Sequence, residues 1–274
     1  MQLKELIPRF AGRFKARVSA QRRVPEYQSF AAALIACGGD GYNQAQIADV
    51  VLRKTAAYRL RLLAEDYPRL TANHVRQLLP LALAARNGLL SVLDLGGGCG
   101  VHYFLAKKVF GRELRLRWSV VETPAMVAKA LSLEADELHF FTNMKTAIAA
   151  SPLPTLVFSS GALHYLPSPY EALEDLISVG APHLFLTRVA LSPNDQDYVF
   201  IHESTLNRHG RGGPLAGMPE ITTSCPTVFA SKQRLEQLLT GRYEIKLELS
   251  EATGAYEFGK RSFNQYGYYC RLRE

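Results

Sequence analysis

The chain of 274 residues has few cysteines, and the four that it has lie far apart: Cys37, Cys99, Cys225 and Cys270. No two of them form a CxxC pair, which argues against a zinc ribbon and against a disulfide framework. Scattered, unpaired cysteines are typical of proteins from a reducing cytoplasm. Histidines and carboxylates show no recognisable metal-ligand spacing either, so we expect no bound metal.

Long hydrophobic runs are also missing. No apolar stretch reaches the roughly 18 residues of a membrane-spanning helix. The N-terminus shows no apolar segment with a small-residue cleavage site, so we expect no signal peptide. There is no internal repeat and no low-complexity tract. With 47% hydrophobic and 21% charged residues, the composition predicts an ordinary soluble, cytoplasmic globular protein.

Acidic residues are scarce at the start of the chain. Residues 1–23 hold seven Lys and Arg against Glu5 alone, a net +6 out of the whole chain's +7, which leaves +1 for residues 24–274. The body therefore lacks the basic surface typical of nucleic-acid binding. No [DN]PP[YFW] motif follows the fourth predicted strand. We do not expect a nucleic-acid partner.

The same basic segment has apolar residues at helical spacing: Leu3, Leu6, Ile7, Phe10, Phe14 and Val18. Two interpretations stay open. A basic amphipathic helix can make a peripheral contact with the anionic inner face of a membrane. Alternatively, the apolar side packs on the protein's own domain and the basic side faces solvent.

The order of elements changes near residue 90. Before it, Asn43 and Thr71 are expected to cap two helices; after it, short apolar runs at 91–95, 118–122, 138–142, 155–160 and 183–191 alternate with helical stretches. Runs at 243–250 and 264–273 predict two final antiparallel strands. The fold class is α/β: a Rossmann-like, mostly parallel seven-stranded sheet with an antiparallel C-terminal strand. We expect a helical N-terminal region over residues 1–90, which covers the crevice at the carboxyl ends of the strands, and an α/β ligand-binding domain over 91–274.

Four glycines fall within "SVLDLGGGCG", residues 91–100, at the end of the first predicted strand. A P-loop is excluded because no Lys follows at the required spacing. The dinucleotide pattern GxGxxG fits Gly96 and Gly98 but meets Val101 at its third glycine. The pattern present is acid-x-Gly-x-Gly-x-Gly.

That pattern resembles the first motif of class I S-adenosylmethionine-dependent methyltransferases, in which the turn passes under the amino-acid part of the cofactor. The resemblance implies S-adenosyl-L-methionine as cofactor, bound at Asp94, Gly96, Gly97, Gly98 and Gly100. Segments "HLFLTRVALSP", "CPTVF" and "YGYYCRLR" resemble a small bacterial subfamily of methyltransferases associated with surface-polysaccharide gene regions.

Further cofactor contacts are expected at the ends of the next strands. A carboxylate at the end of the second strand can accept hydrogen bonds from both ribose hydroxyls, which indicates Glu122 with its neighbour Thr123. The resemblance places Thr142 and Asn143 beside the adenine, although many relatives have an Asp there. It also places the small-residue turn at Ser160 and Gly161 on the far side of the cofactor.

Three residues are candidates for catalysis. His164 suits a general base near neutral pH, or it merely shapes the pocket. Tyr165 follows it, with packing as the alternative. Arg188 interrupts an apolar strand, so it either pairs with an internal carboxylate or binds an anionic or polyhydroxylated substrate. The long segment 192–231, with His202, Glu203, His209 and Arg211, is expected to form a lid or binding loop.

The function that these patterns favour is S-adenosylmethionine-dependent methyl transfer to an oxygen or nitrogen of a small molecule or glycan intermediate. A nicotinamide-dependent oxidoreductase and a non-catalytic cofactor-binding or partner-binding protein are the alternatives. The sequence leaves the acceptor and the oligomeric state open.

Overall fold

A computed structural model describes residues 25–150 and 153–274. The basic segment 1–23 lies outside the described residues, so the interpretations of that segment stay predictions. Among the described helices, none combines the length and the apolar character that crossing a bilayer requires.

The described chain forms eight helices, three short 3-10 turns and nine strands. The helices are α1 Phe30–Ala36, α2 Ala45–Ala64, α3 Ala72–Ala84, α4 Val101–Phe110, α5 Pro124–Ala130, α6 Met144–Ala150, α7 Pro169–Ser178 and α8 Lys232–Arg242. The 3-10 turns are η1 Leu131–Leu133, η2 Leu163–Tyr165 and η3 Leu206–Arg208. The strands are β1 Leu89–Leu95, β2 Arg115–Val121, β3 Leu138–Phe141, β4 Leu156–Ser160, β5 His183–Ser192, β6 Tyr198–Thr205, β7 Thr222–Ser231, β8 Tyr243–Phe258 and β9 Arg261–Leu272.

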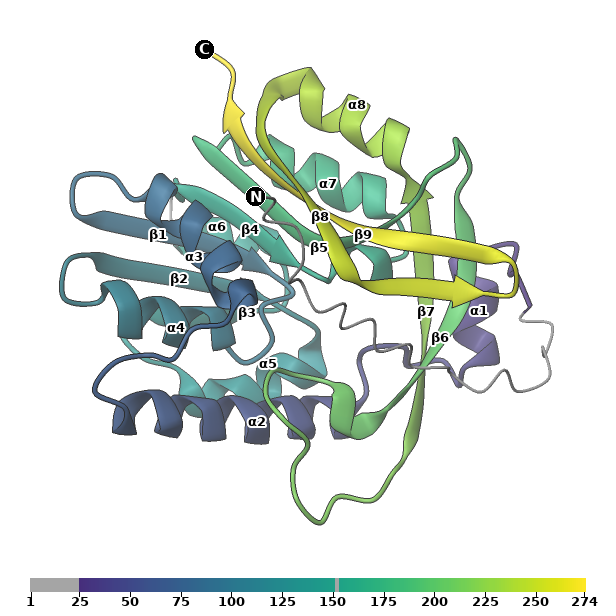
Figure 1. The fold of residues 1–274 in the computed structure, drawn as a ribbon, viewed down its shortest axis with the longest axis horizontal. Helices are drawn as coiled ribbons and strands as arrows, with labels where there is room; N and C mark the ends of the chain where they lie inside the picture. Colours follow the sequence, from purple (N-terminus) through teal and green to yellow (C-terminus); the bar gives the residue numbers. More distant parts are fainter. Residues whose placement is uncertain (1–24, 151–152) are drawn as a thin grey trace, which may run out of the picture.

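Seven of the strands form the expected sheet. Strands β3, β2, β1, β4 and β5 lie side by side and parallel. Strand β9 pairs antiparallel with β5, and β8 pairs antiparallel with β9 (Figure 1). The strand order reverses between β1 and β4, which is where open α/β sheets bind their ligands. The Rossmann-like fold with antiparallel C-terminal strands matches the prediction.

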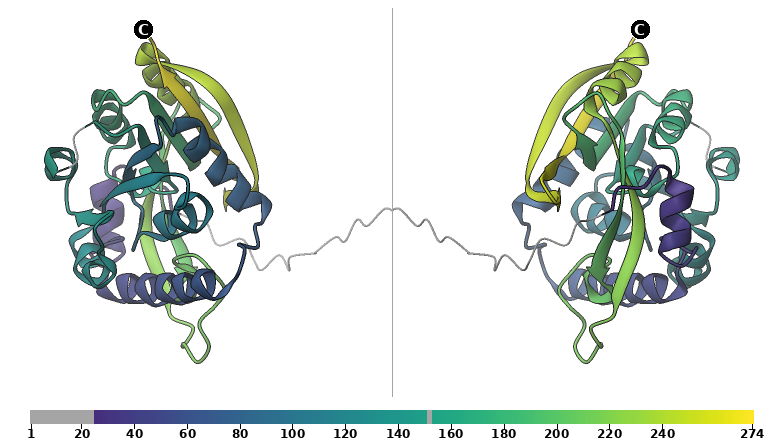
Figure 2. Two further views of the ribbon diagram at one scale, coloured as in Figure 1. Left: turned by 90° about the vertical axis from the view of Figure 1, so that its left-hand side faces the viewer. Right: turned by 90° about the vertical axis from the view of Figure 1, so that its right-hand side faces the viewer.

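The segment expected as a long loop is mostly a hairpin. Strands β6 and β7 pair antiparallel over eight residue pairs, and the irregular part is the connection between η3 and β7. Two parallel pairs, Leu191 with Ala230 and Ser192 with Ser231, join the hairpin to β5. The prediction was wrong because the Gly- and Pro-rich connection dominates the local composition, whereas the pairing that makes the strands is non-local. Figures 1 and 2 show this connection extending past α2.

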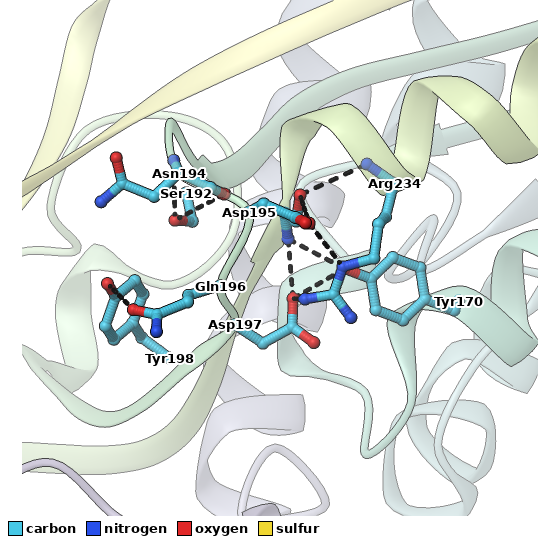
Figure 3. A network of polar contacts seen from close by, with 9 residues as sticks. Tyr170, Ser192, Asn194, Asp195, Gln196, Asp197, Tyr198 and Arg234 are labelled. Atoms are coloured by element: carbon cyan, nitrogen blue, oxygen red, sulfur yellow. Dashed lines mark hydrogen bonds and ion pairs between the residues drawn. The ribbon is translucent and has the colours of Figure 1, made fainter.

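An acidic loop fixes the start of this hairpin (Figure 3). Arg234, near the start of α8, lies 3.1 Å from Asp195 and 3.0 Å from Asp197. The Asp197 carboxylate also accepts hydrogen bonds from the Ser231 backbone N–H at 2.8 Å and from the Tyr170 hydroxyl at 2.7 Å. These contacts tie the loop before β6 to the end of β7 and to α7 and α8. These contacts fix the hairpin at the end where β6 begins and β7 ends.

Two helix starts differ in how they are capped. Thr71 precedes α3 as predicted, and its N–H donates to Nδ1 of His74 at 2.8 Å. Asn43 does not cap α2, which begins after Gln44. The Asn43 side chain instead accepts a hydrogen bond from Ala125 N–H at 3.0 Å, at the start of α5. Asn43, which we expected to cap α2, therefore links the segment before α2 to the start of α5.

Buried side chains form one cluster on each face of the sheet. One cluster joins α2, α3, α4 and α5 to the sheet and includes Ile47, Leu81 and Trp118. The other joins α7 and α8 to the opposite face and includes Leu173 and Tyr243. In every view α2 and α8 lie at opposite ends of the molecule (Figures 1 and 2). Helices α2 and α3 share a core with the sheet, and a domain division at residue 90 stays a prediction.

Candidate active site

A cavity of about 680 Å³ opens at the carboxyl ends of β1, β2 and β4. Its lining comes from the strand ends of the sheet, from α2, α3, α4 and α5, from the inserted hairpin and from β8–β9. Of the residues predicted from sequence, those on the lining are Gly96, Gly97, Gly98, Glu122, Thr123, Thr142, Ser160, Gly161, His164, Tyr165 and Arg188. Asp94, Gly100 and Asn143 lie outside it. A volume of this size suits a cofactor together with a small acceptor.

The glycine turn after β1 requires glycine at successive positions. Gly96 has φ +75°, and a Cβ there would lie 2.2 Å from the Cβ of Ala162. Gly98 has φ +59° and faces Val51 of α2, whose Cγ1 would be 3.3 Å from an added Cβ. A Cβ on Gly97 would overlap the Asp94 carboxylate. Neighbouring groups therefore leave no space for a side chain in the turn, and its exposed backbone forms one wall of the cavity.

Asp94 supports this turn from below. The residue is fully buried, and its Oδ2 accepts hydrogen bonds from Nδ1 of His102 at 3.0 Å and from Nε1 of Trp118 at 3.1 Å. The expected direct contact with a ligand does not follow from this position, because Gly97 covers the carboxylate. Gly100, at φ +82°, starts α4 rather than lining the cavity. Both residues shape the turn.

Glu122 is held by backbone at the end of β2. Its Oε1 accepts from Gly98 N–H at 3.0 Å, and its Oε2 accepts from Thr123 N–H at 2.9 Å. Burial raises its pKa above the ordinary Glu value, although these two N–H groups act in the opposite direction. Each carboxylate oxygen keeps a second lone pair. The residue is therefore a positioned pair of acceptors on the cavity wall.

The residues after β3 separate into two roles. Thr142 lines the cavity. Asn143 turns away, and its Oδ1 accepts from Thr146 N–H at 2.9 Å in the first turn of α6. The adenine contact of Asn143 stays a prediction, and its Oδ1 already accepts one hydrogen bond within this turn.

Arg188 reaches the cavity from a bulge in β5. Its φ is +54°, unusual for a side chain other than glycine, and it lies where the pairing with β9 shifts between Leu186 and Val189. Its Nε donates to Ser160 Oγ at 3.2 Å and its Nη2 to Ser160 O at 3.1 Å. A Cβ on Gly161 would lie 2.8 Å from Nη2. The small residues after β4 thus make room for the guanidinium.

His164 lines the cavity and is almost completely buried. Ala190 N–H lies 3.5 Å from its Nδ1, which must accept, so Nε2 carries the proton and faces the Tyr256 hydroxyl at 3.3 Å. Burial lowers the pKa of His164 to about 3, with the charges of Arg188 and His202 contributing. The imidazole is therefore neutral across the physiological range. It is a weaker base than the free side chain.

Tyr165 points to a histidine that the sequence had assigned only to a loop. Its hydroxyl lies 3.0 Å from Nδ1 of His202, on β6, and 3.5 Å from the Tyr256 hydroxyl. Burial lowers the pKa of His202 below the ordinary histidine value. Tyr165 and His202 both line the cavity. A neutral imidazole with an acceptor nitrogen next to a tyrosine hydroxyl is an arrangement that can receive a proton.

Several lining residues had no signal in the sequence: Tyr42, Arg76, Gln77, Arg208 and Tyr256. His202, His209 and Arg211 had been named only as members of the expected lid or binding segment. These eight residues come from six separate elements or connections. His209, for example, lies 2.8 Å from Thr223 Oγ1 and 3.2 Å from the Tyr42 hydroxyl. No local pattern joins residues so far apart in the chain.

Among the comparisons with known proteins, the one with solved structures found matches. No protein-family model matches the chain, and no curated protein matches it. The N-methyltransferase NodS from Bradyrhizobium japonicum WM9, in complex with S-adenosyl-L-homocysteine, aligns at 16% identity with a TM-score of 0.46, over 80% of this chain and 99% of NodS. An S-adenosylmethionine-dependent methyltransferase from Clostridium acetobutylicum ATCC 824 aligns at 12% identity with a TM-score of 0.46, over 81% and 99% of the two chains. Function is therefore argued from the cavity itself.

Proposed function

We propose that this protein transfers a methyl group from S-adenosylmethionine to an oxygen or nitrogen of a small molecule or glycan intermediate. The observation that carries the proposal is the link between two motifs: the backbone of the glycine turn holds Glu122 on the wall of the same cavity. The turn leaves main chain bare for a ligand, and the carboxylate offers two acceptors suited to a ribose diol.

The cavity residues fit the parts of that cofactor. Gly96, Gly97 and Gly98 would take its amino-acid part, and Glu122 its ribose. Thr142 would face its adenine, and Ser160 and Gly161 would lie on its other side. When bound, S-adenosylmethionine supplies an electrophilic methyl group on a sulfonium. The nearby carboxylate also suits a ligand that carries positive charge.

The chain's own residues then have to place the acceptor and receive its proton. Tyr165 would take part in both, because its hydroxyl faces the cavity and contacts His202 Nδ1. His164, neutral and buried, orients Tyr256. Tyr165 and His202 are therefore the pair that we expect to move a proton, and His164 is a positioning residue. Much of the remaining rate enhancement would come from orientation and from water exclusion.

The oxidoreductase alternative predicts a different ligand. The third glycine of a dinucleotide turn is replaced here by Val101, whose side chain lines the cavity at the start of α4. Calorimetry separates the two functions. We expect S-adenosylhomocysteine to bind at micromolar concentration, about −8 kcal/mol. Binding of NAD without binding of adenosylhomocysteine would overturn the proposal, and absence of turnover with labelled cofactor across acceptor panels would favour a non-catalytic role.

The proposal includes a cytoplasmic location with peripheral contact to the inner membrane surface. Residues 1–23 supply a net +6 with apolar residues at helical spacing. Exposed large apolar side chains on α2, on α3 and in the connection between them support the idea: Leu60, Leu63, Tyr67, Val75, Leu79 and Leu83. Exposed Arg59, Arg61 and Arg69 lie among them in the sequence. This combination suits an anionic bilayer.

Vesicle sedimentation tests this contact. The full-length protein should bind anionic vesicles in low salt and leave them in high salt, at about 1 kcal/mol per basic residue near the surface. Replacing Arg9, Arg13, Lys15 and Arg17 by Gln should release it. Equal partitioning onto neutral and anionic vesicles would overturn the electrostatic contact.

A further inference from the structure

The charges on the cavity wall are strongly unbalanced. Four guanidinium groups line it, those of Arg76, Arg188, Arg208 and Arg211. Among residues 25–150 and 153–274, Glu122 is the one acidic residue on the lining. The rest of the molecule does not share this bias, since residues 24–274 carry a net charge of only +1. The basic character of the folded body is therefore concentrated where a ligand would bind.

The arginines come from other elements than Glu122 and the glycine turn. Arg76 belongs to α3 and Arg188 to β5, while Arg208 and Arg211 lie at and after η3 in the inserted segment. Glu122 and the glycine turn follow β2 and β1. Positive groups thus reach the cavity from several parts of the fold.

Arg211 shows how these groups are held. Its Nη1 donates to Gln77 Oε1 at 2.6 Å, and its guanidinium lies 5.7 Å from the centre of the Tyr58 ring. Within the described part of the chain, these partners are a neutral amide and an aromatic ring. Burial lowers the pKa of Arg211, and the positive charge of Arg188 adds to the effect. A guanidinium in this setting is fixed in direction while its charge is not neutralised by Gln77 or Tyr58.

We propose that the methyl acceptor carries a phosphate or carboxylate group, which Arg211, Arg208 and Arg188 bind while its hydroxyl or amine faces Tyr165. This inference rests on the methyltransferase function proposed above. The fork of N–H donors on arginine matches the oxygens of both anions. A cofactor with a sulfonium adds to the positive charge of the cavity, so an anionic acceptor would also restore balance. A neutral sugar would leave the charge of Arg211 without a countercharge, because Gln77 and Tyr58 supply none.

The experiment uses full-length protein saturated with S-adenosylhomocysteine and calorimetric titration of three probes: inorganic pyrophosphate, succinate and uncharged sucrose. We expect saturable binding of at least one anion and none of sucrose. Preference for pyrophosphate identifies a phosphate-bearing acceptor, and preference for succinate a carboxylate-bearing one. Arg211→Gln should weaken anion binding at least tenfold, and Arg211→Lys should weaken it less because charge is kept and the fork is lost.

Arg112→Gln is the matched control. Arg112 is an exposed arginine in the α4–β2 connection and does not line the cavity, so its loss should leave anion binding unchanged. Affinity for adenosylhomocysteine should be the same in all variants, which shows that the fold persists. Absence of saturable anion binding, equal binding by Arg211→Gln and wild type, or competition between anion and adenosylhomocysteine would overturn this inference. If adenosylhomocysteine itself does not bind, the proposed function fails, and titration of the anions alone still tests the arginine site.

Discussion

The proposed cofactor half and the proposed acceptor half of the cavity are built in different ways. The first consists of the glycine turn, Glu122 and the short residues after β3 and β4, and it presents mainly backbone from strand ends within about 70 residues of sequence. The second is assembled from α3, a bulge in β5, the inserted hairpin and β8, and it presents side chains. Backbone geometry leaves a motif in the sequence because only glycine satisfies it. Side chains that converge from distant elements leave none.

The largest expected effect is on the cofactor half. Gly98→Val places a branched side chain at φ +59° against Val51, which costs about 1–3 kcal/mol in strain alone and fills the turn. Adenosylhomocysteine affinity should fall at least 100-fold, with the fold retained by circular dichroism. Gly213→Val, in the connection before β7 with open space around it, is the control and should bind normally. Unchanged affinity in Gly98→Val would mean that the turn is not the binding wall.

The acceptor half should respond in the opposite manner. Tyr165→Phe removes the hydroxyl that lies 3.0 Å from His202 Nδ1, so turnover should fall about 100-fold while adenosylhomocysteine affinity stays constant. His202→Gln should have a similar effect. Because the two residues are proposed to act as a unit, the double variant should be little worse than either single one. Additive losses would separate their roles.

A smaller effect is expected from Glu122→Gln. The variant replaces a charged acceptor by an amide, a loss of about 1.5–2 kcal/mol, or roughly 10–30-fold in adenosylhomocysteine affinity. Since burial raises the pKa of Glu122, protonation begins at higher pH than for an ordinary Glu, and wild-type affinity should weaken as pH falls. The Gln variant should lack this dependence. Calorimetry across pH 4–8 measures both.

The smallest effect is expected at His164. With a pKa of about 3 in the folded protein, its imidazole stays neutral near pH 7, so His164→Asn should keep turnover within about tenfold and preserve the ascending limb of the pH profile. Loss of that limb would make His164 the base after all.

The same residue links pH to stability. An unfolded histidine takes up a proton near pH 6.5, whereas the buried one does not, so the unfolded state binds more protons below that pH. The free energy of unfolding should therefore decrease as pH falls from about 6.5 toward 3. Urea denaturation of wild type and His164→Asn should show a shallower decrease for the variant.

The sequence predicted the parts of the fold that local pattern determines. Apolar runs and their spacing gave β1 to β5, the last two strands and the helices between them, and the glycines located the turn. It could not give the β6–β7 hairpin, whose pairing depends on residues some 20 positions apart across a Gly- and Pro-rich connection.

The candidate site follows the same division. Asp94 and Asn143 were expected on the cavity wall, but Asp94 bonds His102 and Trp118 below the turn, and Asn143 begins α6. Which acid faces a ligand and which supports the backbone depends on how neighbouring strands stack. The spacing of residues along the sequence does not show how the strands stack. Arg208 carried no signal, and His202 was named only as a member of the 192–231 segment, because the partners of both residues belong to other elements.

The attachment of the β6–β7 hairpin has an evolutionary consequence. Two residue pairs between β5 and β7 and the Asp195–Asp197–Arg234 contacts join it to the sheet, while His202, Arg208 and Arg211 lie farther along the chain. An insertion between these anchor points could be lengthened, shortened or exchanged without altering the turn that faces the cofactor. Substrate preference could then diverge among descendants of one ancestor while the reaction stayed the same. Residues 198–222 are the segment to exchange in order to change the acceptor.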